Sequence, residues 1–377
     1  MRLAFIGAGK IVTEALYAVS GLGQIEKKAI FELEAFKKRA EELAETYGIG
    51  KVYTDYEALL MDPEIDTVYI GLINSVHYLY AKQALLAGKH VILEKPFTMF
   101  YDQAKELERL AWEKGVYILE AITVLHNDVF EEMRKNLSLL GPVRMVLSSY
   151  SQYSSRYDAF RAGEVLPAFD PAKAGGAIMD IGLYTLTYTI GLFGEPKRAT
   201  YLPNIERGID TSGAAILEYD GFTAVNVCAK DCGAPSVMQV QGTDGYVVSN
   251  SQPNICGEVK LHMNDGTEET FDLSRPVMWQ AEFEEFKAQQ EAGDLAECYR
   301  QLDESLLVSR IQNTIRNAIV VADDDITTEQ VSVGTAVEVK DLDDGEIYEY
   351  AIVGANEADP FEDKISNESP VGKALLG

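Results

Sequence analysis

The sequence Leu3-Ala-Phe-Ile-Gly-Ala-Gly-Lys-Ile-Val12 decides the fold of the N-terminal part of the chain. Its first four residues form a continuous apolar run, which is typical of a strand buried in a parallel sheet. Gly7 allows a tight turn, Gly9 lets the backbone approach a pyrophosphate, and the following helix offers its N-terminal amides to the anion. Val12 replaces the third glycine of this pattern, so we expect helix and strand to pack slightly further apart. The stretch predicts a dinucleotide cradle formed by Gly7, Ala8, Gly9, Lys10 and Ile11.

Strands and helices alternate over the first 120 residues, which is typical of a doubly wound parallel sheet of the Rossmann type. The predicted strands are 3–6, 29–33, 67–72, 90–93 and 116–119, and the predicted helices are 36–47, 76–87 and 102–114. An acidic residue after the second strand should bind the adenosine ribose, and both Glu32 and Glu34 fit. A carboxylate there would repel a 2′-phosphate and favours NAD, whereas the basic run at 37–39 favours the alternative, NADP.

The pattern changes after about residue 125, where turn signals such as Tyr-Asp-Gly at 219–221 separate short apolar segments. Predicted strands lie at 143–150, 214–219, 223–229 and 246–249, and predicted helices at 175–193, 277–291 and 296–317. We therefore expect a second, α+β domain with an open antiparallel sheet.

The amino-acid composition limits the classes of partner that this protein can bind. The 377 residues include 60 acidic and 33 basic side chains, for a net charge of −27. This charge speaks against nucleic acid and against an anionic membrane surface, because both need a basic face. No apolar stretch approaches the roughly 20 residues of a membrane helix, and the N-terminus does not resemble a secretory signal, so we expect a cytoplasmic protein. Four cysteines without metal-ligand spacing predict reduced thiols and no metal site.

Two further segments carry chemistry. Glu94-Lys95-Pro96 follows a predicted parallel strand, at the sheet edge where ligands of such folds bind, so Lys95 should point toward the nicotinamide. Asp180 and Tyr184 lie four residues apart in an apolar predicted helix and should share one face of it. An aspartate in so apolar a stretch is costly unless it is paired. A solvated lysine at a strand end and a buried tyrosine on an ordinary helix are the simpler alternatives.

These segments resemble the glucose–fructose oxidoreductase/inositol dehydrogenase (Gfo/Idh/MocA) family. The matching pieces are GAGKIV at 7–12, INSVHY at 73–78, AGKHVILEKPFT at 87–98, EAITVLHND at 120–128 and GGAIMDIGLYTL at 175–186. The resemblance implies an N-terminal Rossmann domain, an α/β domain with an open antiparallel sheet, and NAD(P)-dependent hydride transfer to or from a sugar, cyclitol or related polyol. It also implies a homodimer or tetramer that pairs through the open sheet.

The resemblance also assigns roles to individual residues. Lys95 matches the family's catalytic lysine, Asp180 matches the aspartate of the substrate helix, and Tyr184 stands where many members have histidine, as in members similar to dihydrodiol and xylose dehydrogenases. Positions that match cofactor-lining residues are Asn74, His77, Glu94, Lys95 and Pro96. Positions that match substrate-facing groups are His126, Arg156 and Tyr157. We expect the Lys95 ammonium to lower the pKa of Tyr184, so that the tyrosine can exchange a proton with the substrate hydroxyl.

The last segment differs in charge, since residues 323–377 hold 15 acidic residues and three lysines. Alternating patterns at 331–339 and 348–353, with an Asp-Asp-Gly turn at 343–345, predict a small β module. The stretch from about 311, above all KISNESPVGKALLG at 364–377, resembles the C-terminal, FKBP-like domain of Gre-type transcript cleavage factors. The resemblance implies contact with RNA polymerase. We expect an incomplete module without cleavage activity, because the family's helical hairpin and last strands have no counterpart here.

The sequence thus predicts three domains, at 1–122, 123–318 and 319–377, and an NAD(P)-dependent dehydrogenase acting on CH–OH groups. Two alternatives stay open: a polymerase-binding module with a passenger oxidoreductase domain, and a catalytically idle cofactor-binding scaffold. The presence of Gly7, Gly9, Lys95, Asp180 and Tyr184 favours the enzyme.

Overall fold

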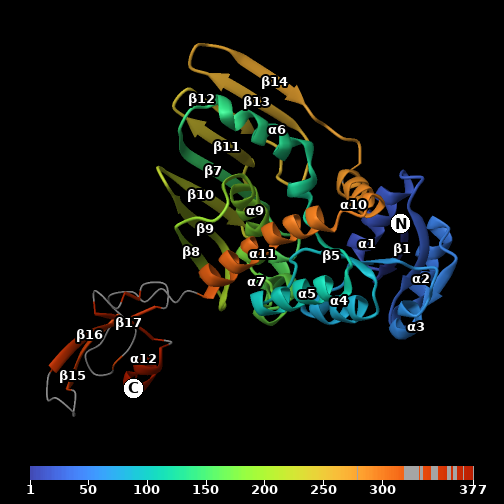
Figure 1. Cartoon of the computed structure of the whole chain (residues 1–377), viewed down its shortest axis with the longest axis horizontal. Coiled ribbons are helices and arrows are strands. Elements are labelled where there is room, and N and C mark those ends of the chain that lie inside the picture. Colours follow the sequence, from blue (N-terminus) through green and yellow to red (C-terminus); the bar gives the residue numbers. More distant parts are fainter. Residues whose placement is uncertain are drawn as a thin grey trace. The chain divides into compact units, whose positions relative to one another are not determined.

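The structure is a computed structural model that describes residues 1–277, 279–317, 331, 334–340, 347–354, 358–359, 363–367 and 369–376. The chain divides into two compact units, Met1–Arg316 and Asn317–Gly377. The larger unit contains two sheets, and the smaller one contains a third (Figure 1).

The first sheet is parallel and has six strands in the order β3-β2-β1-β4-β5-β6. The strands are β1 (Arg2–Ile6), β2 (Glu26–Phe31), β3 (Lys51–Tyr53), β4 (Thr67–Ile70), β5 (His90–Glu94) and β6 (Ile118–Ala121). The helices between them are α1 (Lys10–Ser20), α2 (Lys37–Tyr47), α3 (Tyr56–Leu60), α4 (His77–Leu86) and α5 (Tyr101–Lys114). Every residue of β4 and of β6 is buried, as the continuous apolar runs predict. The predicted doubly wound sheet is confirmed.

Two strand ends differ from the prediction in ways that matter for the site. β2 ends at Phe31, two residues earlier than expected, so Glu32 is the first residue beyond the strand. β6 runs two residues further than expected and carries Glu120 beside Leu93 of β5. In both cases backbone pairing in the sheet, rather than hydrophobicity alone, sets the boundary.

The second sheet has eight strands in the order β14-β13-β12-β11-β7-β10-β9-β8. The strands are β7 (Val143–Ser151), β8 (Arg198–Glu206), β9 (Ile209–Tyr219), β10 (Phe222–Ala229), β11 (Val237–Gly242), β12 (Gly245–Ser249), β13 (Glu258–Met263) and β14 (Glu268–Asp272). The pair β7–β10 is parallel and the other neighbours are antiparallel. The expected open, mostly antiparallel sheet is therefore confirmed.

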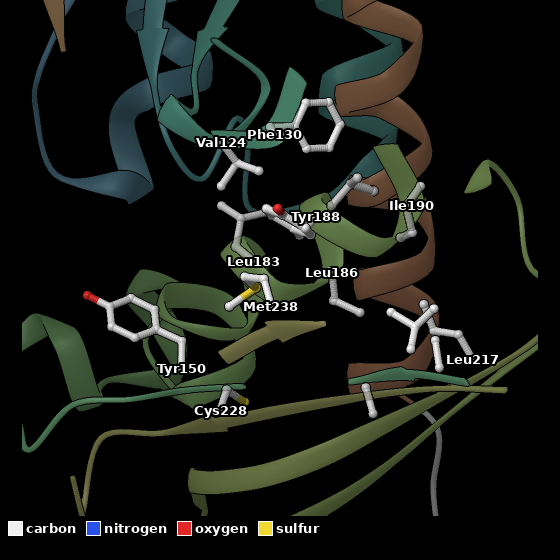
Figure 2. Close-up of a cluster of buried hydrophobic side chains, with 14 of the residues drawn as sticks. Val124, Phe130, Tyr150, Leu183, Leu186, Tyr188, Ile190, Leu217, Cys228 and Met238 are labelled. Atoms are coloured by element: carbon white, nitrogen blue, oxygen red, sulfur yellow. The ribbon is translucent and has the colours of Figure 1, made fainter. Parts of the chain in front are cut away.

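Helices α6 (Asp128–Asn136) and α9 (Gly182–Phe193) pack on one face of this sheet. Their apolar side chains form a common core with inward-facing residues of β7, β9 and β10. Figure 2 shows this cluster, in which Leu186 of α9 lies near Leu217 of the sheet. Tyr150 lies at the margin of the cluster, and its hydroxyl points away from the other labelled side chains.

The predicted helix 175–193 is in fact two helices. α8 (Ala177–Asp180) and α9 are separated at Ile181, and the segments on either side of this break are bent by 56°. Asp180 is the last residue of α8 and Tyr184 lies in the first turn of α9. The prediction that both residues share one helix face was therefore wrong, although the break still brings both to the same site.

Helices α10 (Gln280–Ala292) and α11 (Leu295–Asn317) return the chain to the first sheet. Phe283 and Phe286 of α10 join the core around β1, and Leu302 of α11 joins the core around β4 and β5. Further along α11, Ile311 belongs to the core under the second sheet. The domain boundary at 122/123 stays a prediction, but α10 and the first part of α11, which it assigns to the second domain, pack against the first sheet.

The smaller unit holds a three-stranded sheet in the order β15-β16-β17, from β15 (Ala336–Lys340), β16 (Ile347–Val353) and β17 (Lys364–Ser366), with α12 (Pro370–Leu375). Ser369 caps α12 by accepting a hydrogen bond from the Gly372 amide at 2.9 Å. The predicted strands in this segment are confirmed in kind. The predicted turn at 343–345 lies outside the described residues.

One bent pair of helices meets the length and composition criterion for a membrane span. Within the described ranges, no single helix is long and apolar enough to cross a membrane, and only Pro171–Asp180 and Gly182–Phe193 meet the criterion when taken together. Most residues of α9 are buried in the core shown in Figure 2.

Candidate active site

The glycine loop between β1 and α1 has the geometry of a cradle. Gly7 has φ +108°, and a Cβ at this position would lie 2.9 Å from the Gly71 carbonyl oxygen, so only glycine fits. Its N–H donates to the Phe31 carbonyl at 2.9 Å. Gly9 precedes α1, and a Cβ there would meet no atom within 4 Å. The loop therefore leaves open space at the N-terminus of α1, as an approaching phosphate requires.

Val12 fits because the neighbouring strand provides the missing space. A Cβ on Gly71, just beyond β4, would lie 2.7 Å from Val12 Cγ2 and 3.2 Å from Ile11 Cγ2. Gly71 thus replaces the absent third glycine of the loop. We expected Val12 to push helix α1 slightly away from the strand. Instead, the absence of a side chain at Gly71, directly after β4, provides room for Val12.

Glu32 is the acidic residue that reaches the loop. Its carboxylate accepts hydrogen bonds from the Ala8 N–H and the Leu33 N–H, both at 2.9 Å. Glu34 is exposed, in the single 3₁₀ turn that follows. Of the two candidates that the sequence left open, Glu32 is thus the one bonded to the glycine loop, and its contact with the ribose stays a prediction. The Ala8 N–H is occupied by this bond, and the predicted contact of Ala8 with the cofactor stays a prediction.

The exposed side chain of Lys10 forms an ion pair with Glu14 at 3.6 Å and lies on the solvent side of α1. It is therefore held on its own helix in this structure.

The turn that carries Lys95 is held by three buried side chains. Glu94 accepts from the Lys95 N–H at 3.2 Å and from the Tyr69 hydroxyl at 2.6 Å. Glu120 accepts from the Phe97 N–H at 2.9 Å. His77 bonds the Pro96 carbonyl through Nδ1 at 3.0 Å. Backbone groups on both sides of Lys95 are therefore fixed, which orients its side chain.

The His77 ring is buried between two backbone carbonyls. The side chain is fully buried, and its second ring nitrogen lies 3.1 Å from the Leu72 carbonyl. Burial lowers the pKa of His77, so the ring is neutral and donates to one of the two carbonyls. The ring does not reach the surface in this structure, and its predicted place on the nicotinamide side stays a prediction.

Glu94 is buried as well, and burial raises its pKa to about 7. The hydrogen bond from Tyr69 and the nearby Lys95 lower the pKa only in part. One oxygen of the carboxyl group accepts from Tyr69 and the other from the Lys95 backbone. Glu94 therefore supports the Lys95 turn, and its predicted direct contact with the cofactor is not supported by its burial.

Lys95, Asp180 and Lys230 form one charged cluster. Lys95 Nζ lies 2.8 Å from Asp180 Oδ1, and Lys230 Nζ lies 2.9 Å from Asp180 Oδ2. Burial alone would raise the pKa of Asp180, but the two ammonium groups hold it well below the usual aspartate value. Burial opposes the charge of Lys95, yet Asp180 raises the pKa of Lys95 above its ordinary value. Lys95 and Asp180 are therefore both charged at neutral pH.

Tyr184 lies beside this cluster. The Lys95 ammonium is 5.0 Å from the centroid of its ring, and the Tyr150 ring packs edge-on against it at 5.8 Å. Burial raises the pKa of Tyr184, and Lys95 offsets this only in part. The expectation that Lys95 lowers the pKa of Tyr184 below its usual value was therefore wrong for this state, in which the hydroxyl is protonated at neutral pH.

Asn74 connects two distant segments. It begins the 3₁₀ turn before α4, and its Nδ2 lies 3.5 Å from the Ala174 carbonyl, just before α8. This places Asn74 close to the segment that leads to Asp180, so the structure brings it to the expected side of the molecule.

The three candidate substrate-facing residues fall in two places. His126 binds Glu285 at 2.8 Å and lines a cavity of about 30 Å³, which holds about one water molecule. The predicted contact of His126 with the substrate stays a prediction. Tyr157, on α7 (Tyr157–Arg161), donates to Glu206 at 2.7 Å and packs on Phe169, while Arg156 is exposed at the start of the same helix.

Cysteines and metal ligands add nothing to this site. All four cysteines are free, and the part of the chain that the structure describes contains no group of three His, Cys, Asp or Glu side chains that could hold a metal ion.

The sequence comparisons agree with this geometry. Residues 1–121 match a family model described as "Oxidoreductase family, NAD-binding Rossmann fold", and residues 136–248 match the "GFO/IDH/MocA C-terminal domain". The chain is 32% identical over 322 residues to scyllo-inositol 2-dehydrogenase (NADP(+)) IolU of Bacillus subtilis, an alignment that covers 84% of this chain and 96% of that protein. The chain belongs to the Gfo/Idh/MocA oxidoreductase family.

A second relative supports the same assignment. The chain is 30% identical over 325 residues to D-xylose 1-dehydrogenase (NADP(+)) 2 of Haloferax volcanii, covering 84% of this chain and 96% of that protein. The fold resembles that of KijD10, a 3-ketoreductase from Actinomadura kijaniata, with a TM-score of 0.73 and 23% identity over 84% of this chain and 97% of the other. Residues 326–377 match a separate model, "Transcription elongation factor, GreA/GreB, C-term". Both resemblances predicted from the sequence are thus confirmed.

Sequence reasoning missed three residues of this Gfo/Idh/MocA site. Lys230 follows the apolar strand β10, and a lysine directly after such a strand was the available signal. Glu120 stands in the matched stretch EAITVLHND, but nothing in that stretch indicates its bond to Phe97. Tyr150 gave no signal, because an aromatic residue in a strand is ordinary.

Proposed function

We propose that this protein is an NAD(P)-dependent dehydrogenase that transfers hydride between the nicotinamide and a CH–OH carbon of a sugar, cyclitol or related polyol. The observation that carries the proposal is the Lys95–Asp180 pair at 2.8 Å with the Tyr184 ring beside it. The named activities of the two relatives, on scyllo-inositol and D-xylose, support the same substrate class.

The residues of the first sheet fit a dinucleotide. The open space at Gly9 and the N-terminus of α1 suit the pyrophosphate, and Glu32 suits the ribose hydroxyls because each carboxylate oxygen still has a free lone pair. When bound, the nicotinamide supplies the acceptor or donor of the hydride. Asn74 and Lys95 would lie on its side of the cleft, with Pro96 in the turn that carries the lysine.

Proton transfer is the task of Tyr184 and Lys95. During oxidation the C–H and O–H bonds of the carbinol break, the hydride leaves with its electron pair for the nicotinamide, and the proton passes to Tyr184 in its deprotonated, phenolate form. During reduction Tyr184, which is protonated in this structure, donates the proton to the new hydroxyl oxygen. Asp180 holds the Lys95 ammonium at 2.8 Å, which keeps its positive charge near the developing oxygen anion.

The cofactor preference rests on Glu32. A carboxylate bonded to the glycine loop places negative charge where a 2′-phosphate would bind, which favours NAD(H). The two relatives are named for NADP(+), and the basic run at 37–39 would serve that cofactor. We retain NAD(H) as the preferred cofactor and NADP(H) as the alternative.

A polyol panel tests the activity. The full chain is mixed with NAD+ or NADP+ and with scyllo-inositol, myo-inositol, D-xylose, D-glucose and a dihydrodiol, and absorbance at the reduced-nicotinamide band is followed. We expect turnover on at least one polyol and its loss in Lys95→Ala. Cofactor binding without turnover on any carbinol, or on the matching ketones with reduced cofactor, would favour the idle scaffold and contradict the proposal.

Assembly and the tail complete the proposal. We infer a homodimer or tetramer that forms through the face of the eight-stranded sheet opposite α9, because the apolar residues Leu147, Val225 and Ile216 are neighbours on that face.

The match of residues 326–377 makes RNA polymerase a partner to test in a pull-down. A polymerase-binding module with a passenger oxidoreductase is not favoured as the main function, because the oxidoreductase relatives cover 84% of the chain.

A further inference from the structure

Lys230 is a buried charged residue, and burial of its ammonium group costs free energy. Its side chain is 2% exposed, and its ammonium group lies 2.9 Å from Asp180 Oδ2. It also donates to the Ala168 carbonyl at 2.6 Å and lies 4.6 Å from the centroid of the Phe169 ring. Taking an ammonium group out of water costs several kcal/mol, and a buried ion pair can often be replaced by apolar residues without loss of stability. A contribution to folding stability alone therefore does not explain why a lysine is buried at this position.

Its position links two parts of the site. Ala168 and Phe169 lie in the 3₁₀ turn Pro167–Phe169, and Tyr157 of α7 packs on the same Phe169 ring. Asp180 ends α8, and its other oxygen faces Lys95. Through one ammonium group, Lys230 thus joins the segment before α8 to the carboxylate that orients Lys95.

Several other titratable groups face this cluster, namely Glu94 from β5, Tyr150 from β7, Tyr184 from α9, Asp210 from β9 and Cys228 from β10. Burial raises the pKa of Asp210, which accepts from the Ile178 N–H and the Tyr201 hydroxyl. Whatever charge these groups carry, loss of the Lys230 ammonium makes the site one unit more negative. That change disfavours any anion formed beside Lys95.

We propose that Lys230 is a positioning residue of the oxidoreductase site, which holds Asp180 toward Lys95 and supplies the positive charge that favours an anion at Tyr184 or at the substrate oxygen. The inference rests on the proposed function, since it concerns the same site. Lys230 touches neither a substrate nor a cofactor in this scheme and acts through Asp180.

The pH dependence of oxidation tests this role. In Lys230→Met the rise of kcat/KM with pH should move to higher pH by about one unit, the scale on which a nearby opposite charge shifts a pKa. Activity at pH 7 should fall about tenfold and recover in alkaline buffer, as such a shift implies. Lys230→Arg, which keeps the charge, should retain the wild-type profile. A lower plateau with an unshifted profile would show a merely structural role and overturn the inference.

A second readout needs no substrate. The oxidised nicotinamide is a cation and the reduced one is neutral, so a more negative site should bind the oxidised cofactor better. The ratio of the two dissociation constants, oxidised over reduced, should fall about threefold or more in Lys230→Met and stay unchanged in Lys230→Arg. Lys230→Gln, which keeps a donor for the Ala168 carbonyl, should behave like the Met variant and replaces it if that variant does not fold.

The two readouts separate the two proposals. A fall in the ratio without turnover of any polyol would support the role of Lys230 while the proposed substrate class fails. Turnover of a polyol with unchanged ratio and unchanged pH profile in both neutral variants would keep the proposed function and overturn the inference about Lys230.

Discussion

Lys95 and Asp180 stand 85 residues apart in the chain, and their charged groups meet at 2.8 Å. Lys95 follows a strand of the parallel sheet, and Asp180 ends a helix that leads onto the second sheet. The ion pair therefore joins the two halves of the larger unit at the place where the Tyr184 ring lies. The proposed chemistry depends on this meeting point, and the predictions below start from it.

Tyr184→Phe should lower turnover by about 10²-fold or more, the scale for loss of a positioned acid–base group, and Lys95→Ala should do the same. Both variants should bind the cofactor almost as the wild type does. Tyr188→Phe is the matched control, because Tyr188 lies one turn further along α9 and its hydroxyl contacts Met133 in the core. Steady-state kinetics and fluorescence titration measure both effects. Wild-type turnover in Tyr184→Phe would remove the tyrosine from the mechanism.

The wild type should bind NAD(H) more tightly than NADP(H), because the Glu32 carboxylate is held at the glycine loop. In Glu32→Gln this preference should shift toward NADP(H) by about tenfold, the scale of one hydrogen bond to a charged group. Glu34→Gln, an exposed change two residues away, should leave both affinities unchanged. Calorimetry measures the dissociation constants of both cofactors for each of the three proteins. Equal or tighter binding of NADP(H) by the wild type would contradict the role given to Glu32.

The buried carboxyl of Glu120 should make stability depend on pH. Burial raises its pKa from the ordinary 4.5 to about 7, so the folded protein keeps a proton that the unfolded chain has lost between these values. The contribution of Glu120 to the free energy of unfolding is thus present below about pH 4.5 and is lost as the pH rises through about 7.

Glu120→Gln has no group that titrates here, so its free energy of unfolding should not fall with pH in this way. Relative to the wild type, the free energy of unfolding of the variant should therefore rise between pH 5 and pH 8, by up to about 3 kcal/mol. The glutamine oxygen can still accept from the Phe97 N–H. Urea denaturation at both pH values measures the difference, and Glu34→Gln serves as the exposed control. A difference that is the same at pH 5 and pH 8 would show that Glu120 does not titrate in this way.

Association should depend on the face of the second sheet opposite α9. Leu202 of β8 is 56% exposed there, and its partner across the strands is Ala214. A charge in an apolar contact is costly to bury, so Leu202→Glu should convert dimers or tetramers into smaller species. Met61→Glu, at an 80% exposed position beside the first sheet, should keep the wild-type mass. Light scattering at micromolar concentration measures the molar mass of each variant. A monomeric wild type would exclude the proposed assembly.

Deletion of residues 319–377 should leave cofactor binding and turnover within about twofold, because the residues of the proposed site all lie in the unit Met1–Arg316. The main unfolding transition should stay where it is. A longer deletion from residue 307 should fail to give soluble protein, since it removes Val308, Ile311 and Ile315 from the core under the second sheet. Loss of activity in the shorter deletion would make the tail part of the working enzyme.

Local sequence determined much of this protein. The run at 3–6, the glycines at 7 and 9, and the alternation of apolar strands with helices specify a parallel sheet with a cradle, because these features depend on neighbouring residues and on fixed periods. The family resemblance added Lys95, Asp180 and Tyr184 as the central residues. The strands of the tail were also readable, since alternation with a period of two is a local signal.

Only the tertiary structure decided which of these residues meet and in what state. Pairing in the first sheet ended β2 at Phe31 and gave Glu32, not Glu34, to the glycine loop. Burial raised the pKa of Tyr184, and packing buried the rings of His77 and His126. The second partner of Asp180, Lys230, lies 50 residues further along the chain and comes to it only because β10 pairs with β7 beneath α8 and α9. Burial and long-range charge pairing depend on the whole fold, so no local stretch of sequence contains them.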